Sequence, residues 1–123
     1  FGIRLNPWQE EFLKKAWPGQ ISAILPCASK KLEYLHRGTQ TLAFRLPSDE
    51  KLYALLGKTG PLAAPSANPE GLQPAVTIVQ ARAYFADTVD FYEDAGELSG
   101  EPSTLVSLLG ESPVVLRQGA VTL

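Results

Sequence analysis

The chain has 123 residues, 45% hydrophobic and 20% charged, which is typical of a soluble globular domain with one core. Its formal net charge of -2 gives no overall basic field for nucleic acid, and no apolar run is long enough to span a membrane. One cysteine, Cys27, excludes an intrachain disulfide and fits a reducing compartment, so we expect a cytoplasmic protein. The sequence has no methionine and begins with Phe1, which suggests a piece of a longer chain.

The first predicted element is a helix that starts after Asn6 and ends before Pro18. Asn6 followed by Pro7 has the pattern of an N-cap with proline at the first helical position, and Gln9 at N3 completes a capping box. Its apolar residues recur at helical spacing and predict one buried face, formed by Trp8, Phe12, Leu13 and Ala16. The apolar run at 20–26 that follows is predicted to be a strand.

Residues 30–37 are predicted to be weakly helical or irregular. The only histidine, His36, lies in this stretch, and we expect it to be a solvated loop residue. One His and one Cys cannot build a conventional zinc site, and they do not form a Cys–His nucleophilic pair at a recognised spacing. The sequence therefore assigns neither a metal ligand nor a catalytic nucleophile.

Residues 39–46 alternate well enough to predict a strand. The alternation places Thr41, Ala43 and Arg45 on one face of that strand. Arg45 has apolar neighbours on both sides, a costly arrangement unless an anion meets it, and its planar guanidinium suits a carboxylate or a phosphate. The alternative is an edge strand with Arg45 in water.

A second helix is predicted to begin at Ser48, as its N-cap, and to end at Leu56. Gly57 follows at the position where a glycine commonly terminates a helix. The leucines of this helix, Leu52, Leu55 and Leu56, are expected to point inward.

A short apolar strand at 62–65 is predicted to lead into a loop of small polar residues. Small side chains let the backbone approach a ligand, Ser66 offers a hydroxyl, and Asn68 offers both a donor and an acceptor. The loop ends near a helix N-terminus, an arrangement that suits an anion. The simpler interpretation is that these residues only make a turn.

Thr77 and Gln80 have the spacing of a capping box at the start of a helix that runs through Phe85. The remaining chain is predicted to form three strands, at 89–93, 102–106 and 113–116. About six strands interleaved with three helices indicate an α/β fold with a twisted open mixed sheet and flanking helices. We expect residues 1–123 to form a single domain.

Several segments, in the right order, resemble the YrdC-like domain of the threonylcarbamoyl-AMP synthase family. Residues 64–71 resemble its signature APSAN-x-x-G. The other matching segments are 17–25 (WPGPLTLIL in the family), 41–47 (TVGVRVP), 102–106 (PSTVV) and 116–121 (LRPGAI). The chain departs from these motifs by having Gln20 for Pro, Ser22 for Thr, Ala43 for Gly and Gln118 for Pro.

The resemblance implies synthesis of threonylcarbamoyl-AMP from L-threonine, bicarbonate and ATP, with release of pyrophosphate and with Mg²⁺ on the phosphates. The product would supply the transferase machinery that makes threonylcarbamoyladenosine in tRNA. Such chemistry needs positioning and neutralisation of oxyanions more than an acid–base pair. No catalytic residue is therefore assigned.

The resemblance implies two groups of site residues, at the positions that match the family's motifs. The residues that would bind threonine are Arg45, Ser66 and Ser103. Those that would contact ATP are Thr41, Asn68 and Arg117. Val76 stands where the family often has a phosphate-side threonine, and the adjacent Thr77 would take over that contact unless it is lost.

Family members also carry a further N-terminal part of about seventy residues, with a PT-x-T-x-YG loop and a K-x-R segment that bind ATP. We therefore expect an apparently truncated YrdC-like domain that is active in the intact protein and poorly active or inactive alone. The alternatives are a catalytically incompetent remnant, a double-stranded-RNA-binding module, and the carbamoyl-adenylate-handling domain of a hydrogenase-maturation carbamoyltransferase. The net charge of -2 argues against RNA binding.

Overall fold

The computed structural model describes residues 1–123 and shows a mixed α/β fold. The chain forms two compact units. The first unit contains Phe1–Gly60 and Glu101–Leu123, so it combines both ends of the chain, and the second contains Pro61–Gly100. None of the helices combines the length and the apolar composition that a membrane crossing requires.

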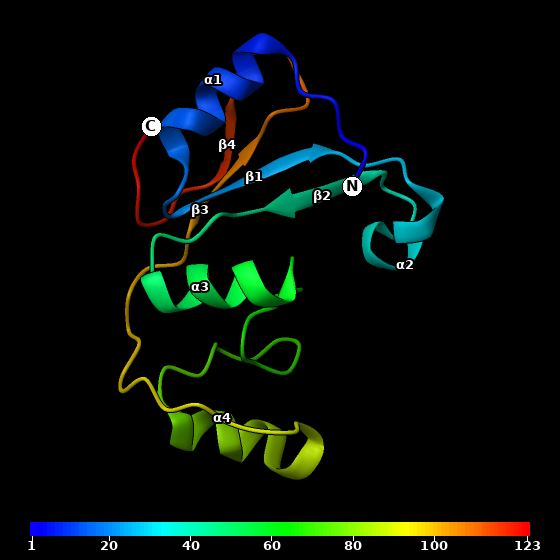
Figure 1. Ribbon diagram of the computed structural model, residues 1–123. Coiled ribbons are helices and arrows are strands. Elements are labelled where there is room, and N and C mark those ends of the chain that lie inside the picture. Colours follow the sequence, from blue (N-terminus) through cyan, green and yellow to red (C-terminus); the bar gives the residue numbers. More distant parts are fainter. The chain divides into compact units, whose positions relative to one another are not determined.

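The first unit is built on an open four-stranded sheet in the order β2-β1-β3-β4 (Figure 1). β1 (Ile21–Pro26) pairs antiparallel with β2 (Thr41–Phe44) and parallel with β3 (Thr104–Ser107). β3 in turn pairs antiparallel with β4 (Val114–Arg117). The central parallel pair therefore joins two segments that lie at opposite ends of the sequence.

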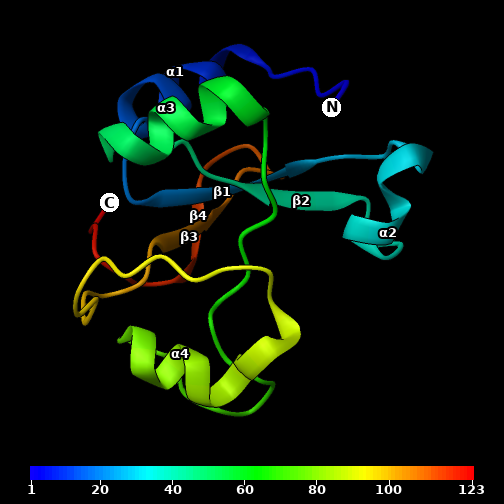
Figure 2. The same cartoon turned by 60° about the horizontal axis from the view of Figure 1, so that its bottom comes forward.

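One face of this sheet carries the hydrophobic core. Side chains alternate between the two faces of a strand, and every second residue of β1 is buried, from Ile21 to Leu25. Helix α1 (Pro7–Ala16) lies along the sheet (Figures 1 and 2) and packs Leu13 into the core. The buried core residues are Leu13, Ile21, Ala23, Leu25, Val106 and Leu108.

The predicted capping box of α1 is confirmed. Asn6 Oδ1 accepts from Gln9 N at 3.0 Å, and Gln9 Oε1 accepts from Asn6 N at 2.9 Å. The buried Gln9 side chain also donates to the Leu108 carbonyl at 2.6 Å. One residue thus closes the helix N-terminus and attaches it to the chain beyond β3, a contact that the sequence pattern did not indicate.

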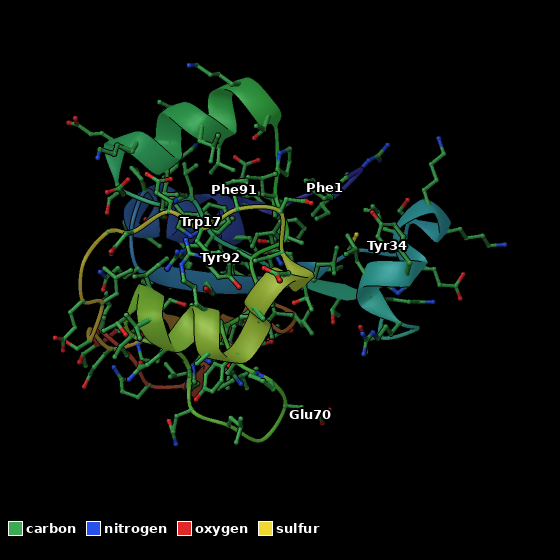
Figure 3. The ribbon with its side chains drawn as sticks, turned by 90° about the horizontal axis from the view of Figure 1, so that it is seen from below. Phe1, Trp17, Tyr34, Glu70, Phe91 and Tyr92 are labelled. Carbon is green, nitrogen blue, oxygen red and sulfur yellow. The ribbon has the colours of Figure 1, made fainter.

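The prediction that His36 is a solvated loop residue is wrong. The 3₁₀ helix η1 (Lys30–Leu32) is followed by α2 (Glu33–His36), where His36 is only 6% exposed. Its Nδ1 accepts from Gly38 N at 3.2 Å, and its Nε2 lies 3.3 Å from the Ser29 carbonyl. The chain turns directly after α2, where Arg37 has a positive φ of 47°, and Tyr34 of the same helix points into solvent (Figure 3).

The second predicted helix is displaced towards the C-terminus. α3 (Glu50–Thr59) is capped by Asp49, whose carboxylate accepts from Leu52 N at 2.9 Å, and not by Ser48. It continues through Gly57, because one glycine inside a helix costs only about 1 kcal/mol. It ends at Thr59, and the C-cap Gly60 leads the chain out of the helix with a positive φ of 76°.

The prediction that the leucines of the second helix point inward is wrong, because they do not lie in a core. Leu52 is 46% exposed and Leu55 is 43% exposed, and no residue of α3 is buried. The helical spacing correctly indicated an amphipathic helix, but it could not indicate whether a partner covers the apolar face.

The predicted strands at 62–65 and 89–93 are wrong, so the chain has four strands instead of six. Both segments belong to the second unit, which contains no strand for them to pair with. β-propensity depends on such pairing partners, and Phe91 remains 79% exposed.

The second unit contains α4 (Ile78–Phe85) and the 3₁₀ helix η2 (Ala86–Thr88). The predicted N-cap is present, since Thr77 Oγ1 accepts from Gln80 N at 3.3 Å. The reciprocal bond is shifted by one residue, because Gln80 Oε1 accepts from Val76 N at 2.9 Å.

Candidate functional site

The face of the sheet opposite the core, here called the open face, carries several of the candidate site residues. Directly paired residues on neighbouring strands share a face. Thr41 is paired with Pro26 and Ala43 with Ile24, and these positions alternate with the buried residues of β1. The predicted common face of Thr41 and Ala43 is therefore confirmed, and it is the face without core residues.

A row of residues crosses the open face from one edge strand to the other. Ser22 is paired with Leu105, and Leu105 is paired with Arg117. Arg45 directly follows the last residue of β2, and one further step of the β1–β2 register brings it level with Ser22. Three inter-strand spacings of about 4.8 Å place the outer strands about 14 Å apart. The row thus has an arginine at each end.

Neither arginine of this row is neutralised by a carboxylate. The two ion pairs of the chain both lie on α1, between Glu10 and Lys14 and between Glu11 and Lys15. Arg45 is exposed and makes no side-chain hydrogen bond, while Arg117 donates through Nη2 to the Ser103 carbonyl at 3.0 Å. The row is therefore suited to an elongated molecule with anionic groups.

Ser103 lies directly before β3, and Arg117 of β4 together with the chain after β4 holds the backbone of Pro102 and Ser103. Ala120 N donates to the Pro102 carbonyl at 2.9 Å, beside the bond from Arg117. A Cβ at Gly119 would lie 2.1 Å from the Pro102 oxygen and 2.8 Å from the Ser103 carbonyl group, so only glycine fits there. The Ser103 hydroxyl points to the open face, where its Oγ is 2.7 Å from Ser22 Oγ.

Thr104, the next residue, anchors this arrangement from the core side. It is fully buried, and its Oγ1 accepts from Gly119 N and from Val121 N, both at 3.1 Å, while donating to the Val121 carbonyl. Thr104 lies in a segment that resembles a family motif but was not a candidate site residue, and Ser22 was noted only as a departure from a motif. Their partners lie about fifteen or more residues away in sequence, so no local pattern could reveal these roles.

The other candidate residues lie in the second unit, on a loop of small side chains. The loop is closed by Ala75 N donating to the Ala67 carbonyl at 2.9 Å, and Glu70 lies at its outer bend (Figure 3). Ser66 is exposed. Asn68 Nδ2 donates to the Pro69 carbonyl at 3.0 Å, but its Oδ1 is buried with no hydrogen-bond partner.

The structure thus brings four of the seven candidate residues to one face of one unit: Thr41, Arg45, Ser103 and Arg117. Ser66, Asn68 and Thr77 belong to the other unit, where the Thr77 hydroxyl is already engaged as a helix cap. That the two groups share one site stays a prediction.

Comparison with known families and sequences gives a consistent result. A family model described as "Telomere recombination", for Sua5, YciO and YrdC proteins, matches residues 3–119. The threonylcarbamoyl-AMP synthase of Bacillus subtilis is 36% identical over 114 residues, which cover 89% of this chain and 33% of that protein. The threonylcarbamoyl-AMP synthase of Pyrococcus abyssi is 32% identical over 120 residues, which cover 95% and 35%.

Solved structures show the same relationship. Pyrococcus abyssi Sua5, crystallised with L-threonine, superposes with a TM-score of 0.82 at 30% identity and covers 94% of this chain. Escherichia coli YciO superposes with a TM-score of 0.81 at 25% identity and covers 95% of this chain. The chain spans about half or less of the length of the curated relatives it matches, for example 52% of a Mycobacterium tuberculosis protein and 33% of the Bacillus subtilis enzyme.

Proposed function

Because the chain belongs to the Sua5/YciO/YrdC family, we propose that it forms the threonine-binding and part of the nucleotide-binding surface of an L-threonylcarbamoyl-AMP synthase. The observation that carries this proposal is the row across the open face, with Arg45 and Arg117 at its ends and the Ser103 hydroxyl beside it. The solved relative with bound L-threonine supports the choice of amino acid.

In this proposal Arg45 binds the carboxylate of L-threonine through two parallel hydrogen bonds, and Ser103 and Ser66 also contact the amino acid. The threonine amine combines with bicarbonate, losing water, to give a carbamate. A carbamate oxygen then attacks the α-phosphorus of ATP, and pyrophosphate leaves. The protein contributes by holding the reactants together and by neutralising their negative charge.

The ATP-binding role falls to Thr41, Asn68, Arg117 and Thr77. Arg117 carries a charge that suits phosphate oxygens. The orphaned, buried Asn68 Oδ1 is an acceptor and therefore requires a donor, which a ribose hydroxyl or the adenine amino group supplies and a phosphate does not. Thr77 retains a hydroxyl proton, since its oxygen serves as an acceptor in the helix cap.

Mg²⁺ enters this proposal with the nucleotide. No three His, Cys, Asp or Glu side chains gather into a group that could hold a metal ion. Mg²⁺ is commonly held by substrate phosphates and water with few protein ligands, so the donor set here fits an ion carried by ATP. When bound, the ion would neutralise charge on the phosphates.

The product would pass to the tRNA threonylcarbamoyl transferase machinery in the cytoplasm. A module that binds double-stranded RNA would instead rely on phosphate contacts spread over many basic residues. RNA affinity that falls with salt and survives Arg45→Ala would favour that alternative.

The test of the proposed function is the affinity for L-threonine, measured by isothermal titration calorimetry. We expect Arg45→Ala to weaken binding about 10- to 100-fold, because hydrogen bonds to a charged group are lost. Arg45→Lys restores little of it, since an ammonium cannot form the bidentate pair. The matched control is Arg4→Ala, which removes an exposed arginine of the N-terminal segment. Equal affinities of the Arg45→Ala and unchanged proteins would contradict the proposal.

A further inference from the structure

Ser22 lies at the centre of the row that crosses the open face. It is half-buried on β1, with Leu105 opposite it on β3 and Ser103 Oγ at 2.7 Å from its own Oγ. Neither hydroxyl makes any other side-chain hydrogen bond. Ser22 is therefore joined to a candidate threonine-binding residue by the only hydrogen bond that either side chain forms.

The two hydroxyls, here called the serine pair (Ser22 and Ser103), have two protons between them. The bond that joins them uses one proton and leaves one free. If Ser22 donates, the Ser103 proton remains free for a ligand, whereas if Ser103 donates, its oxygen can only accept from a ligand. A carboxylate or carbamate oxygen accepts and does not donate, so such a ligand requires the first arrangement.

Hydrogen bonds fix the backbone at Ser103, so rotation of its side chain is the main freedom that remains. Its carbonyl accepts from Arg117, and the neighbouring Pro102 carbonyl accepts from Ala120 N. The following residue, Thr104, is fully buried. A hydroxyl on a clamped backbone still rotates among its staggered rotamers, and a hydrogen bond from Ser22 selects one of them.

We propose that Ser22 is a positioning residue for the amino-acid substrate: it donates to Ser103 Oγ and thereby holds the Ser103 hydroxyl so that its proton faces the anionic oxygens of L-threonine. This rests on the proposed function. Ser22 acts through Ser103 and needs no direct contact with the substrate.

The test is a double-mutant cycle on L-threonine affinity, measured by calorimetry, with ATP affinity measured in parallel. Ser22→Ala is expected to weaken L-threonine binding about 3- to 10-fold, the effect of one lost hydrogen bond, and to leave ATP binding unchanged. Ser22→Thr keeps the hydroxyl and restores the affinity. The double variant Ser22→Ala/Ser103→Ala binds no more weakly than Ser103→Ala alone.

The matched control is Ser29→Ala, at another half-buried serine of the first unit whose side chain makes no hydrogen bond. Thermal unfolding shows whether each variant is folded. If Ser22→Ala is not, the nearly isosteric Ser22→Cys, a weak donor, replaces it in the cycle and is expected to show the same loss.

The inference is overturned if Ser22→Ala binds L-threonine normally while Ser103→Ala does not, if the two losses multiply in the double variant, or if Ser22→Thr is as weak as Ser22→Ala. The proposed function itself fails if Arg45→Ala and Ser103→Ala both leave L-threonine binding unchanged. The proposed role of Ser22 then fails with it.

Discussion

Individual residues on the two sides of β3 have separate tasks. The hydroxyl of Ser103 faces the open side and pairs with Ser22, whereas that of Thr104 is fully buried and serves the backbone of the C-terminal segment. A buried donor left without a partner costs more than the net gain of an ordinary hydrogen bond. Thr104 should therefore contribute strongly to stability although it contacts no proposed ligand.

We expect Thr104→Val to lower the free energy of unfolding by about 2 kcal/mol, because two part-buried backbone N–H groups lose their acceptor. Thr104→Ser keeps the hydroxyl and loses one buried methyl group, which costs about 1 kcal/mol. Urea denaturation of the three proteins measures both values. A valine variant as stable as the serine variant would show that the hydroxyl is dispensable.

At the scale of elements, local signals in the sequence were reliable where the structure depends on local contacts. The start of α1 was predicted from Asn6, Pro7 and Gln9, and the start of α4 from Thr77. Where two adjacent residues could cap a helix, the predicted N-cap was wrong, since Asp49 caps α3 and not its neighbour Ser48. Strand predictions were wrong where strand formation depends on a pairing partner, because a run such as 89–93 has strand composition but no neighbouring strand to bond with.

The candidate site was predicted to a similar extent. The alternation of β2 correctly placed Thr41 and Ala43 on one face, and motif positions pointed to Ser103 and Arg117. The contacts that hold Ser103 could not be predicted, because the partners come from β1 and from β4. Such contacts exist only once the central parallel pair has formed.

The cap of α1 gives a prediction at this scale. We expect Asn6→Ala to destabilise the protein by about 1 kcal/mol, because Gln9 N loses its acceptor. Asn6→Asp retains an acceptor at the helix N-terminus and should be at least as stable as the unchanged protein. Chemical denaturation monitored by circular dichroism compares the three. Equal stability of the alanine and aspartate variants would contradict a stabilising role for this cap.

At the scale of the whole molecule, burial is concentrated in the first unit. All core residues belong to it, and no residue of Pro61–Gly100 is fully buried. Segments with few buried contacts open more readily than core strands. The loop with Ser66 and Asn68 therefore lies in the less protected unit, as is common for binding segments.

Hydrogen exchange followed by mass spectrometry tests both statements. We expect the amides of β1 and β3 to exchange most slowly and those of residues 61–76 to exchange early. Adding L-threonine and ATP together should slow exchange in residues 64–71, while residues 89–96 of the same unit serve as the internal control. Protection confined to the first unit would mean that Ser66 and Asn68 are not ligands.

The opposite orientations of Ser103 and Thr104 also constrain how the gene can change. A shift of β3 by one position would turn Ser103 towards the core and Thr104 towards the open side, because successive side chains alternate. Inserting or deleting one codon within this strand would therefore damage folding and ligand recognition together. Point substitutions, in contrast, can alter either property alone.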